Sequence, residues 1–443
     1  MKRKWLYILI FLPTFYSCLE SPEMTIGIVN GKEKPTVQTV KTNPSPNDDG
    51  NLFFQGEVTS IGKAEITEKG FFWSTISNDP NINDNVIISD ANSDIFTCEL
   101  QSASGGKTYY WRAYAKNSYG IEYGEVNSYE SLPIWEKKDS LNGRSRGKGA
   151  IFILNNNIYM ICGEYKLEGG YSLVENDAWE YNIIIDRWNQ LEDKQSFPGI
   201  GRINPVAFTI GDLAFVGTGT GVVGVATVVV YKDFFQYDGI SNSWAKIAVP
   251  DDLEARYEAV AFSLNGKGYI IGGLSENRNA LKDVWQYDPE NGLWERKNDF
   301  PEGFYGGISI SDNNRVFAGL SYAPLSEYRR ILLEYNKETD NWEKFTTLPD
   351  DVAIYGNVIS GVIVQNFIYI VDNNNIIWTL NMNDETKTWK KKTALPPDLI
   401  LTNEEDESES GFQLLLTTGR SNSIYVGLGY NKYLYEYRPL WDN

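Results

Sequence analysis

The chain has 443 residues, of which 42% are hydrophobic, so it can form two or three domains with their own cores. Its formal net charge of −19 argues against non-specific binding to nucleic acid, which requires clustered lysine and arginine. Histidine is absent, which excludes a Ser-His-Asp triad and any zinc, copper or non-haem iron site with histidine ligands, and no cofactor is expected.

The first eighteen residues have the pattern of an export signal. Three basic residues at positions 2–4 precede an apolar run at 5–13 that is too short to span a bilayer. The segment Phe15-Tyr16-Ser17-Cys18 then resembles the lipobox of Bacteroidetes-type bacterial lipoproteins. The resemblance implies a signal peptide over 1–17, lipidation of Cys18, and a tether over 18–34 that holds the protein on the surface of a Gram-negative outer membrane. An ordinary secretory signal and the inner face of that membrane are the alternatives.

Short alternating runs separated by turn clusters predict a β-sandwich over residues 35–133. In the run 108–117, period-two alternation puts Tyr109 and Trp111 on one face and Tyr110 on the other. This run and the upstream GFFWST segment resemble the fibronectin type III-like domains of Bacteroidetes surface proteins. The resemblance implies a seven-stranded immunoglobulin-like spacer, with Tyr109 as its tyrosine-corner residue.

Tryptophan recurs with a period of about 50 residues through the rest of the chain. Most of these tryptophans end a similar phrase, such as EYNIIIDRW, QYDGISNSW or EYNKETDNW. The period predicts an array of small sheets, with the indole rings packed between neighbouring sheets. The six tryptophans are Trp135, Trp188, Trp244, Trp294, Trp342 and Trp389.

The clearest repeat covers residues 256–297. An apolar run at 259–264, the dipeptide Asn265-Gly266 and a second run at 268–273 predict a hairpin, because both turn residues accept positive φ. Runs at 283–288 and 293–297 add two strands, which makes a four-stranded propeller blade. The pattern resembles the kelch repeat. This resemblance implies a kelch β-propeller in which Arg146, Arg202 and Arg256 occupy the kelch arginine position.

The number of blades follows from the way the ring closes. The last repeat ends at residues 433–440 without an outer strand, and residues 134–137 can supply that strand. The expected fold is all-β, with a six-bladed kelch-type β-propeller over 134–443 preceded by an immunoglobulin/fibronectin III-like β-sandwich. A seven-bladed ring with one degenerate repeat is the alternative.

The loops that lead into the inner strands are expected to surround the mouth of the central channel. They carry basic residues on one half and aromatic residues on the other. Arginine forks pair with carboxylates, so an acidic sugar or an acidic peptide is an expected ligand. The predicted ligand-binding residues are Arg146, Lys148, Arg202, Asn204, Arg256, Glu258, Tyr305 and Tyr355. The alternative is that the arginines anchor loops by bonding carbonyl groups.

Two other loops have an unusual composition. Residues 217–231 are rich in glycine and then valine, which predicts an extended hairpin with an apolar surface for a partner. The acidic run at 404–409 is a candidate calcium site with Glu404, Glu405 and Asp406 as ligands, although its spacing matches no EF-hand. A solvated acidic loop is the alternative, and no other metal site is expected.

Three functional hypotheses follow. The first, which we expect, is a non-catalytic surface lipoprotein that binds a glycan or a protein at the propeller mouth, as a monomer or within an envelope complex. The second is a carbohydrate-active kelch enzyme of the sialic acid mutarotase type, with Glu258 and Arg256 as the acid–base pair. A galactose-oxidase-type copper site is excluded because histidine is absent. The third is a structural partner in an envelope complex.

Overall fold

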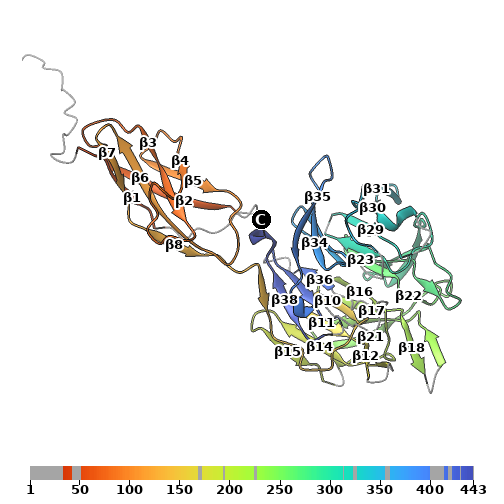
Figure 1. Cartoon of the computed structure of the whole chain (residues 1–443). Coiled ribbons are helices and arrows are strands. Elements are labelled where there is room, and N and C mark those ends of the chain that lie inside the picture. The colour runs from red at the N-terminus through yellow and green to blue at the C-terminus, as the bar shows by residue number, and fades with distance from the viewer. Residues whose placement is uncertain are drawn as a thin grey trace, which may run out of the picture. The chain divides into compact units, whose positions relative to one another are not determined.

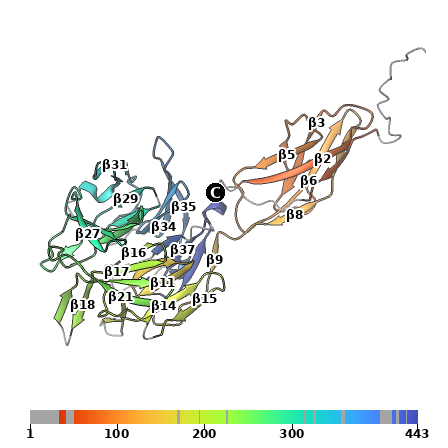
Figure 2. The same cartoon turned by 180° about the vertical axis from the view of Figure 1, so that it is seen from behind.

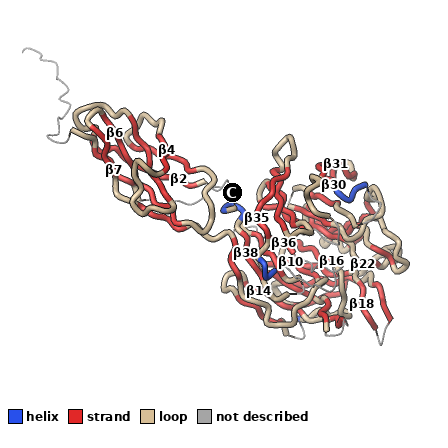
Figure 3. The backbone as a smooth tube through the Cα atoms, in the orientation of Figure 1, coloured by secondary structure: helices blue, strands red, loops and turns tan. Residues whose placement is uncertain are grey.

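Strands build most of the molecule, as Figure 3 shows. The computed structural model describes residues 33–41, 51–167, 172–192, 195–223, 227–312, 314–322, 327–354, 360–399, 414–417, 422–429 and 431–442. Three short 3₁₀ turns also occur in these residues, at η2 (Glu327–Arg330), η3 (Pro397–Leu399) and η4 (Pro439–Trp441). The described helices are all too short to cross a membrane. The predicted signal peptide, Cys18 and the acidic run at 404–409 lie outside the described residues.

The first part of the chain forms two antiparallel sheets (Figure 1). One has the order β1 (Thr36–Thr39), β2 (Leu52–Ser60), β5 (Ile95–Leu100). The other has the order β4 (Asn85–Ile88), β3 (Glu68–Ser74), β6 (Thr108–Asn117), β7 (Gly120–Tyr123), and β8 (Asn127–Glu130) pairs with β6. Apolar side chains of both sheets, such as Phe54, Phe71 and Trp111, are fully buried. Tyr109 is buried too, and its hydroxyl accepts a 2.7 Å hydrogen bond from the Ser104 amide, which is the contact of a tyrosine corner.

The chain from residue 135 onward forms six four-stranded antiparallel sheets within the described ranges. The first three are β10 (Ala150–Leu154), β11 (Asn157–Ile161), β14 (Ala178–Asn182), β15 (Arg187–Gln190); β16 (Val206–Ile210), β17 (Leu213–Gly217), β20 (Phe234–Asp238), β21 (Ser243–Ile247); and β23 (Val260–Leu264), β24 (Lys267–Ile271), β26 (Val284–Asp288), β27 (Leu293–Lys297). The last three are β28 (Ile308–Ser311), β29 (Val316–Gly319), β30 (Ile331–Asn336), β31 (Asn341–Thr347); β32 (Ser360–Val364), β33 (Phe367–Val371), β34 (Ile376–Asn381), β35 (Trp389–Ala394); and β36 (Leu414–Thr417), β37 (Ile424–Gly427), β38 (Leu434–Tyr437), β9 (Trp135–Lys137).

These sheets are arranged in a ring (Figure 2). Their first strands contact one another in the order β10, β16, β23, β28, β32, β36, and β36 contacts β10 again. A cavity of about 250 Å³ lies between the inner strands. Ser263 Oγ donates to the Thr209 carbonyl at 2.6 Å and Ser309 Oγ to the Ala261 carbonyl at 2.8 Å, so inner-strand hydroxyls join neighbouring sheets.

The connections between the second and third strands of three sheets take part in small two-stranded ladders, two formed within the connection and one formed with the loop that enters the first strand. These are β12 (Glu164–Lys166) with β13 (Ser172–Val174), β18 (Thr220–Val223) with β19 (Thr227–Val230), and β25 (Leu274–Ser275) with β22 (Arg256–Tyr257). The pairing of β18 with β19 confirms the hairpin predicted over 217–231. Val222 and Val228 of this hairpin are 50% and 65% exposed, and a partner for them stays a prediction.

Three of the recurring tryptophans, Trp188, Trp244 and Trp294, tie their sheet to the one before it by a hydrogen bond. The Nε1–H group of Trp188 donates to the Asp139 carbonyl at 3.0 Å, and that of Trp244 donates to the Gln195 carbonyl at 2.8 Å. Both acceptors lie 49 residues earlier in the chain. In these sheets the repeat period therefore corresponds to one hydrogen bond between neighbours, whereas the indole N–H groups of Trp135, Trp342 and Trp389 have no hydrogen-bond partner among the described residues.

In several repeats the phrase that precedes the tryptophan is a turn closed by a tyrosine hydroxyl. Tyr181 donates to Asp186 at 2.6 Å, and Tyr335 donates to Asp340 at 2.7 Å. Asp186 and Asp340 have φ of 50° and 51°, a conformation that aspartate and asparagine tolerate better than most residues. The same pair of aspartates accepts main-chain N–H groups from the preceding sheet, at 2.8 Å for Asp186 and 2.9 Å for Asp340.

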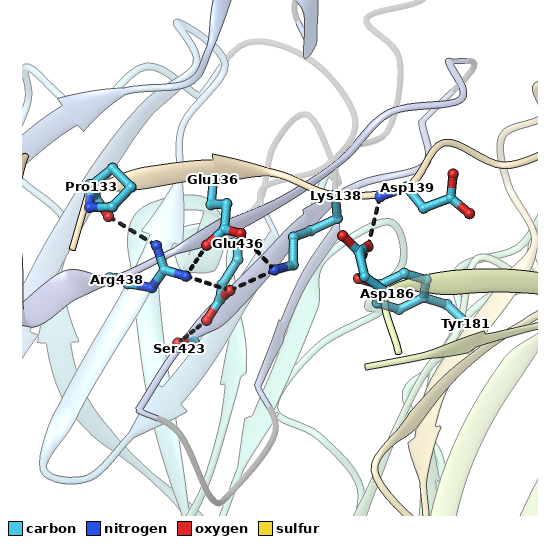
Figure 4. Close-up of polar contacts among 9 residues, drawn as sticks. All are labelled: Pro133, Glu136, Lys138, Asp139, Tyr181, Asp186, Ser423, Glu436 and Arg438. Atoms are coloured by element: carbon cyan, nitrogen blue, oxygen red, sulfur yellow. Dashed lines mark hydrogen bonds and ion pairs between the residues drawn. The ribbon is translucent and has the colours of Figure 1, made fainter. Parts of the chain in front are cut away.

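The ring is completed by pairing of its first and last strands along the chain. Strand β38 pairs with β9, with Glu436 opposite Glu136. Figure 4 shows the polar contacts at this junction. Arg438 donates to Glu136 and, at 2.8 Å, to Glu436. Lys138 Nζ lies 3.1 Å from Glu436 and 3.3 Å from Glu136. Two cations and two carboxylates therefore alternate across the junction.

Candidate active site

The loops that enter the inner strands gather at one end of the ring, which we call the mouth and define by Lys148, Asn204, Glu258 and Tyr305. Lys148, Asn204 and Glu258 occupy equivalent positions in successive sheets, and their φ angles are 59°, 51° and 55°. The Asn204 amide donates to the Lys148 carbonyl at 2.8 Å, and the Gly306 amide donates to the Glu258 carbonyl at 3.0 Å. Left-handed backbone costs free energy for residues with a Cβ and is concentrated at functional sites.

Glu258 is the acidic group at the mouth and is partly buried. Burial raises the pKa of its carboxyl above the ordinary value of 4.5, and the charge of Lys148 partly opposes this effect. The Asn204 side-chain amide lies 3.5 Å from Glu258 Oε1 and donates toward it. Glu258 therefore gains and loses a proton closer to neutral pH than a solvated glutamate does.

Lys148 supplies the positive charge that lowers the pKa of this carboxyl against the effect of burial. Its Nζ lies 2.8 Å from Glu164 Oε1, and the two side chains are only 18% and 9% exposed. The backbone supports the pair, because Gly147 and Glu164 exchange two main-chain hydrogen bonds of 2.9 Å. Glu164 was absent from the predicted site. Its position one residue after Gly163, at the end of the second strand, is the sequence feature that could have indicated it.

Tyr305 contributes an aromatic ring to the same end of the ring. It is partly buried and packs edge-to-face against Tyr322 with ring centroids 6.0 Å apart. Burial raises the pKa of the Tyr305 hydroxyl, and the neighbouring Glu258 charge raises it further. Tyr305 is therefore a neutral hydrogen-bond donor at physiological pH. Tyr322 and Tyr257 were absent from the predicted site; the pKa of Tyr257 is likewise raised by burial and by Glu258.

Residues 255–301 match the family model described as Kelch motif. The ring is a β-propeller that carries kelch repeats. An N-acetylneuraminate epimerase of Yersinia enterocolitica is 37% identical over 118 residues, which cover 25% of this chain and 29% of that protein. An N-acetylneuraminate epimerase of Pasteurella multocida is 23% identical over 279 residues, or 55% of this chain and 67% of that protein. The solved structure of YjhT has 16% sequence identity and a TM-score of 0.49, covering 65% of this chain and 91% of that chain.

Several of these alignments span less than half of the curated relative. The alignment with a putative F-box/kelch-repeat protein of Arabidopsis thaliana, at 25% identity, covers 37% of this chain and 45% of that protein. The similarity therefore identifies repeats, and a whole-protein activity requires separate argument.

The three kelch arginines are buried beneath the mouth and bound to aspartates of their own sheets. Arg146, Arg202 and Arg256 are 2%, 0% and 0% exposed. The carboxylate partners are Asp177 for Arg146, Asp233 for Arg202 at 2.6 Å, and Asp283 for Arg256 at 2.6 and 2.7 Å.

Arg202 illustrates how fully such a guanidinium is engaged. It also donates to the carbonyls of Ile200 and Thr218 at 3.0 Å each, and it lies between the rings of Phe197 and Tyr231 at 4.7 and 4.5 Å. A guanidinium with these partners anchors a loop. This agrees with the alternative that the arginines bond carbonyl groups instead of a ligand. We therefore leave the three arginines out of the ligand site. An aspartate 31 residues after Arg146 and Arg202, and 27 after Arg256, is the signal that could have revealed the pairing.

Two predicted sets of site residues lie outside the described residues. These are Tyr355 at the mouth and the calcium candidates Glu404, Glu405 and Asp406. In the ranges that the structure does describe, no three His, Cys, Asp or Glu side chains are grouped to hold a metal ion. The structure thus brings together Lys148, Asn204, Glu258 and Tyr305 from the predicted set.

Proposed function

We propose that this protein is a carbohydrate-active kelch propeller that interconverts the anomers of an acidic sugar, in the manner of an N-acetylneuraminate epimerase of the mutarotase type. The single observation that carries the proposal is Glu258, a partly buried carboxyl at the mouth whose pKa is raised by burial. Two bacterial relatives named N-acetylneuraminate epimerase support this choice of substrate class. The relatives favour this reading over the non-catalytic binding module that we expected from the sequence.

Glu258 is suited to the chemistry of mutarotation. Opening of the sugar ring removes a proton from the anomeric hydroxyl, breaks the bond between the anomeric carbon and the ring oxygen, and protonates that oxygen. Closure on the opposite face of the carbonyl reverses these steps. A carboxyl that titrates nearer to neutral pH can serve as donor or acceptor, and such groups contribute roughly 10²–10⁴-fold to a rate. Arg256 is excluded from this role because Asp283 occupies its guanidinium.

The other mouth residues would bind and orient the sugar. The Asn204 amide and the neutral Tyr305 hydroxyl can hydrogen-bond sugar hydroxyls, and the Tyr305 ring can pack on a sugar face. Lys148 would attract an acidic substituent, although Glu164 offsets much of its charge.

The test measures the exchange rate between the two anomers of N-acetylneuraminate by NMR, with and without the purified protein. We expect acceleration by the wild type and a loss of roughly 10²–10⁴-fold in Glu258→Gln. Glu290→Gln is the matched control, because Glu290 is exposed on the turn between β26 and β27. Saturable binding of the sugar with no acceleration over buffer would instead favour the non-catalytic module.

We also propose the finer architecture and location. The ring is six kelch blades, and residues 35–133 are a fibronectin type III-like spacer. The two sheets of this module and the Tyr109–Ser104 contact support the spacer. The basic, apolar and Cys18 segments of residues 2–18 support a lipoprotein of the outer membrane. Its partner is then a glycan or a surface protein. Labelling of intact cells with an antibody or a protease would test surface exposure.

A further inference from the structure

Lys148 interacts with two carboxylates from the loops of different sheets, and Asn204 contacts both Lys148 and Glu258. The Nζ of Lys148 is 2.8 Å from Glu164 Oε1, and its charge is the main influence that opposes the effect of burial on Glu258. Glu164 begins β12, while Glu258 belongs to the loop that enters β23. A single cation therefore couples the hairpin of the first sheet to the candidate catalytic carboxyl.

The backbone and side chain of Glu164 are both fixed, which lets Glu164 hold the Lys148 ammonium in place. Its backbone pairs with that of Gly147, the residue before Lys148, and its side chain is only 9% exposed. Lys148 is also fixed from the other side, because its carbonyl accepts the Asn204 amide at 2.8 Å. A long lysine side chain loses much of its rotamer freedom in such a setting, so the position of the ammonium depends on its carboxylate partner.

We propose that Glu164 is a positioning residue of the mouth, which holds Lys148 and limits the positive charge that Lys148 presents to Glu258. The inference deepens the proposed function and rests on Glu258 as its acid–base group. Within the described ranges, Tyr257 and Tyr305, which are neutral, also face the charge of Glu258, and the exposed Arg278 acts on Tyr257.

The two partners should act on Glu258 with opposite sign. Removal of the Lys148 charge takes away the interaction that favours the ionised form of Glu258, so Glu258 keeps its proton to higher pH. Neutralisation of Glu164 removes the ion pair that holds the Lys148 ammonium, which can then approach Glu258, so Glu258 loses its proton at lower pH. A unit charge about 8 Å away, at an effective dielectric constant of roughly 20–40, shifts a titration by about 0.8 to 1.5 pH units.

The experiment follows the carboxyl ¹³C signal of Glu258 against pH in the full chain, with Glu258→Gln to assign the signal. We expect a shift to higher pH in Lys148→Met and to lower pH in Glu164→Gln. Glu290→Gln should leave the titration unchanged. If Glu164 acts through Lys148, Glu164→Gln should shift the titration less in the Lys148→Met background than in the wild type.

Shifts of the same sign in the two single variants would overturn the inference, as would an effect of Glu164→Gln that is equal in both backgrounds. If Glu164→Gln alone does not fold, the double variant, in which no charge is left unpaired, is compared with Lys148→Met. An unaltered titration between those two supports action through Lys148, and a shift as large as that caused by Lys148→Met contradicts it. The titration requires no turnover, so its result is separate from the anomer-exchange test of the proposed function.

Discussion

A buried arginine needs partners for its charge and for all of its donors, because transfer of an ion out of water is costly. Arg256 meets this need with both oxygens of Asp283 and with the carbonyls of Glu254 and Gly272, at 3.0 and 2.9 Å. Asp283 in turn accepts the indole N–H of Trp285 at 2.7 Å. The entry loop, the second strand and the third strand of the blade are thus joined around one guanidinium.

We expect Arg256→Ala to lower the free energy of unfolding by about 3–5 kcal/mol, because it leaves Asp283 buried without its counter-charge. Arg144→Ala should cost less than about 1 kcal/mol, since Arg144 is 63% exposed. Urea unfolding at neutral pH measures both. Equal effects of the two substitutions would show that the buried pair contributes little.

The same pair has a pH dependence whose sign follows from Asp283. Burial acts to raise the pKa of Asp283, but the hydrogen bonds and charge of Arg256 outweigh it and hold the pKa below the ordinary value of 3.8. A lowered folded-state pKa gives stability that is present above the unfolded value and is lost as pH falls through the folded value. The difference in the free energy of unfolding between wild type and Arg256→Ala should therefore become smaller below about pH 4.

At the level of elements, the third blade depends on a hairpin turn and on a close approach of backbone at the end of its second strand. In the third blade the turn residues Asn265 and Gly266 have φ of 51° and 72°. At the other end of β24, Gly272 has φ of 58°, and a Cβ there would lie 2.3 Å from the Phe304 carbonyl oxygen. Both glycines have left-handed backbone, but only Gly272 lies against another chain segment.

The pair Gly272→Ala and Gly266→Ala separates backbone strain from steric clash. Gly266→Ala should cost about 1–2 kcal/mol, because nothing lies within 4 Å of its added Cβ and only the conformation is disfavoured. Gly272→Ala should cost a further 1–3 kcal/mol or so, since the carbonyl must move. Thermal unfolding of both variants tests this order, and a reversed order would contradict it.

For the whole molecule, the repeated sheets could be predicted from the sequence, whereas the partners of individual charged side chains could not. The tryptophan phrase specified the sheets because one turn, closed by pairs such as Tyr335 and Asp340, is repeated along the chain. The roles of the arginines were less accessible. Arg202 is occupied by Asp233, which lies 31 residues away, and only the fold brings the two together. Glu164 could not be assigned to the mouth for the same reason.

Closure of the ring depends on a segment far away in the sequence. We expected residues 134–137 to complete the last sheet. In the structure, β9 lies within these residues and pairs with β38 of that sheet. Arg438 and Glu136, which are 302 residues apart, are bonded across this junction, and Glu436 beside them is only 11% exposed. Closure of so long a loop carries a large entropic cost, so contacts at the junction should affect the stability of the entire ring.

We therefore expect Arg438→Ala to lower the free energy of unfolding at neutral pH by about 2–3 kcal/mol, less than for a fully unpaired buried charge because Lys138 still contacts Glu436. Arg296→Ala is the control, since its partner Asp299 is 34% exposed and such pairs contribute about 1 kcal/mol or less.

The hydrogen bond from Arg438 is the main cause that lowers the pKa of Glu136 below its ordinary value of 4.5. This contribution is present above that value and disappears as pH falls through the lower folded-state pKa, so the gap between wild type and Arg438→Ala should shrink on acidification. Urea unfolding at neutral pH and below pH 4 or so would measure the gap, and a gap that widens in acid would contradict the assigned role of this junction.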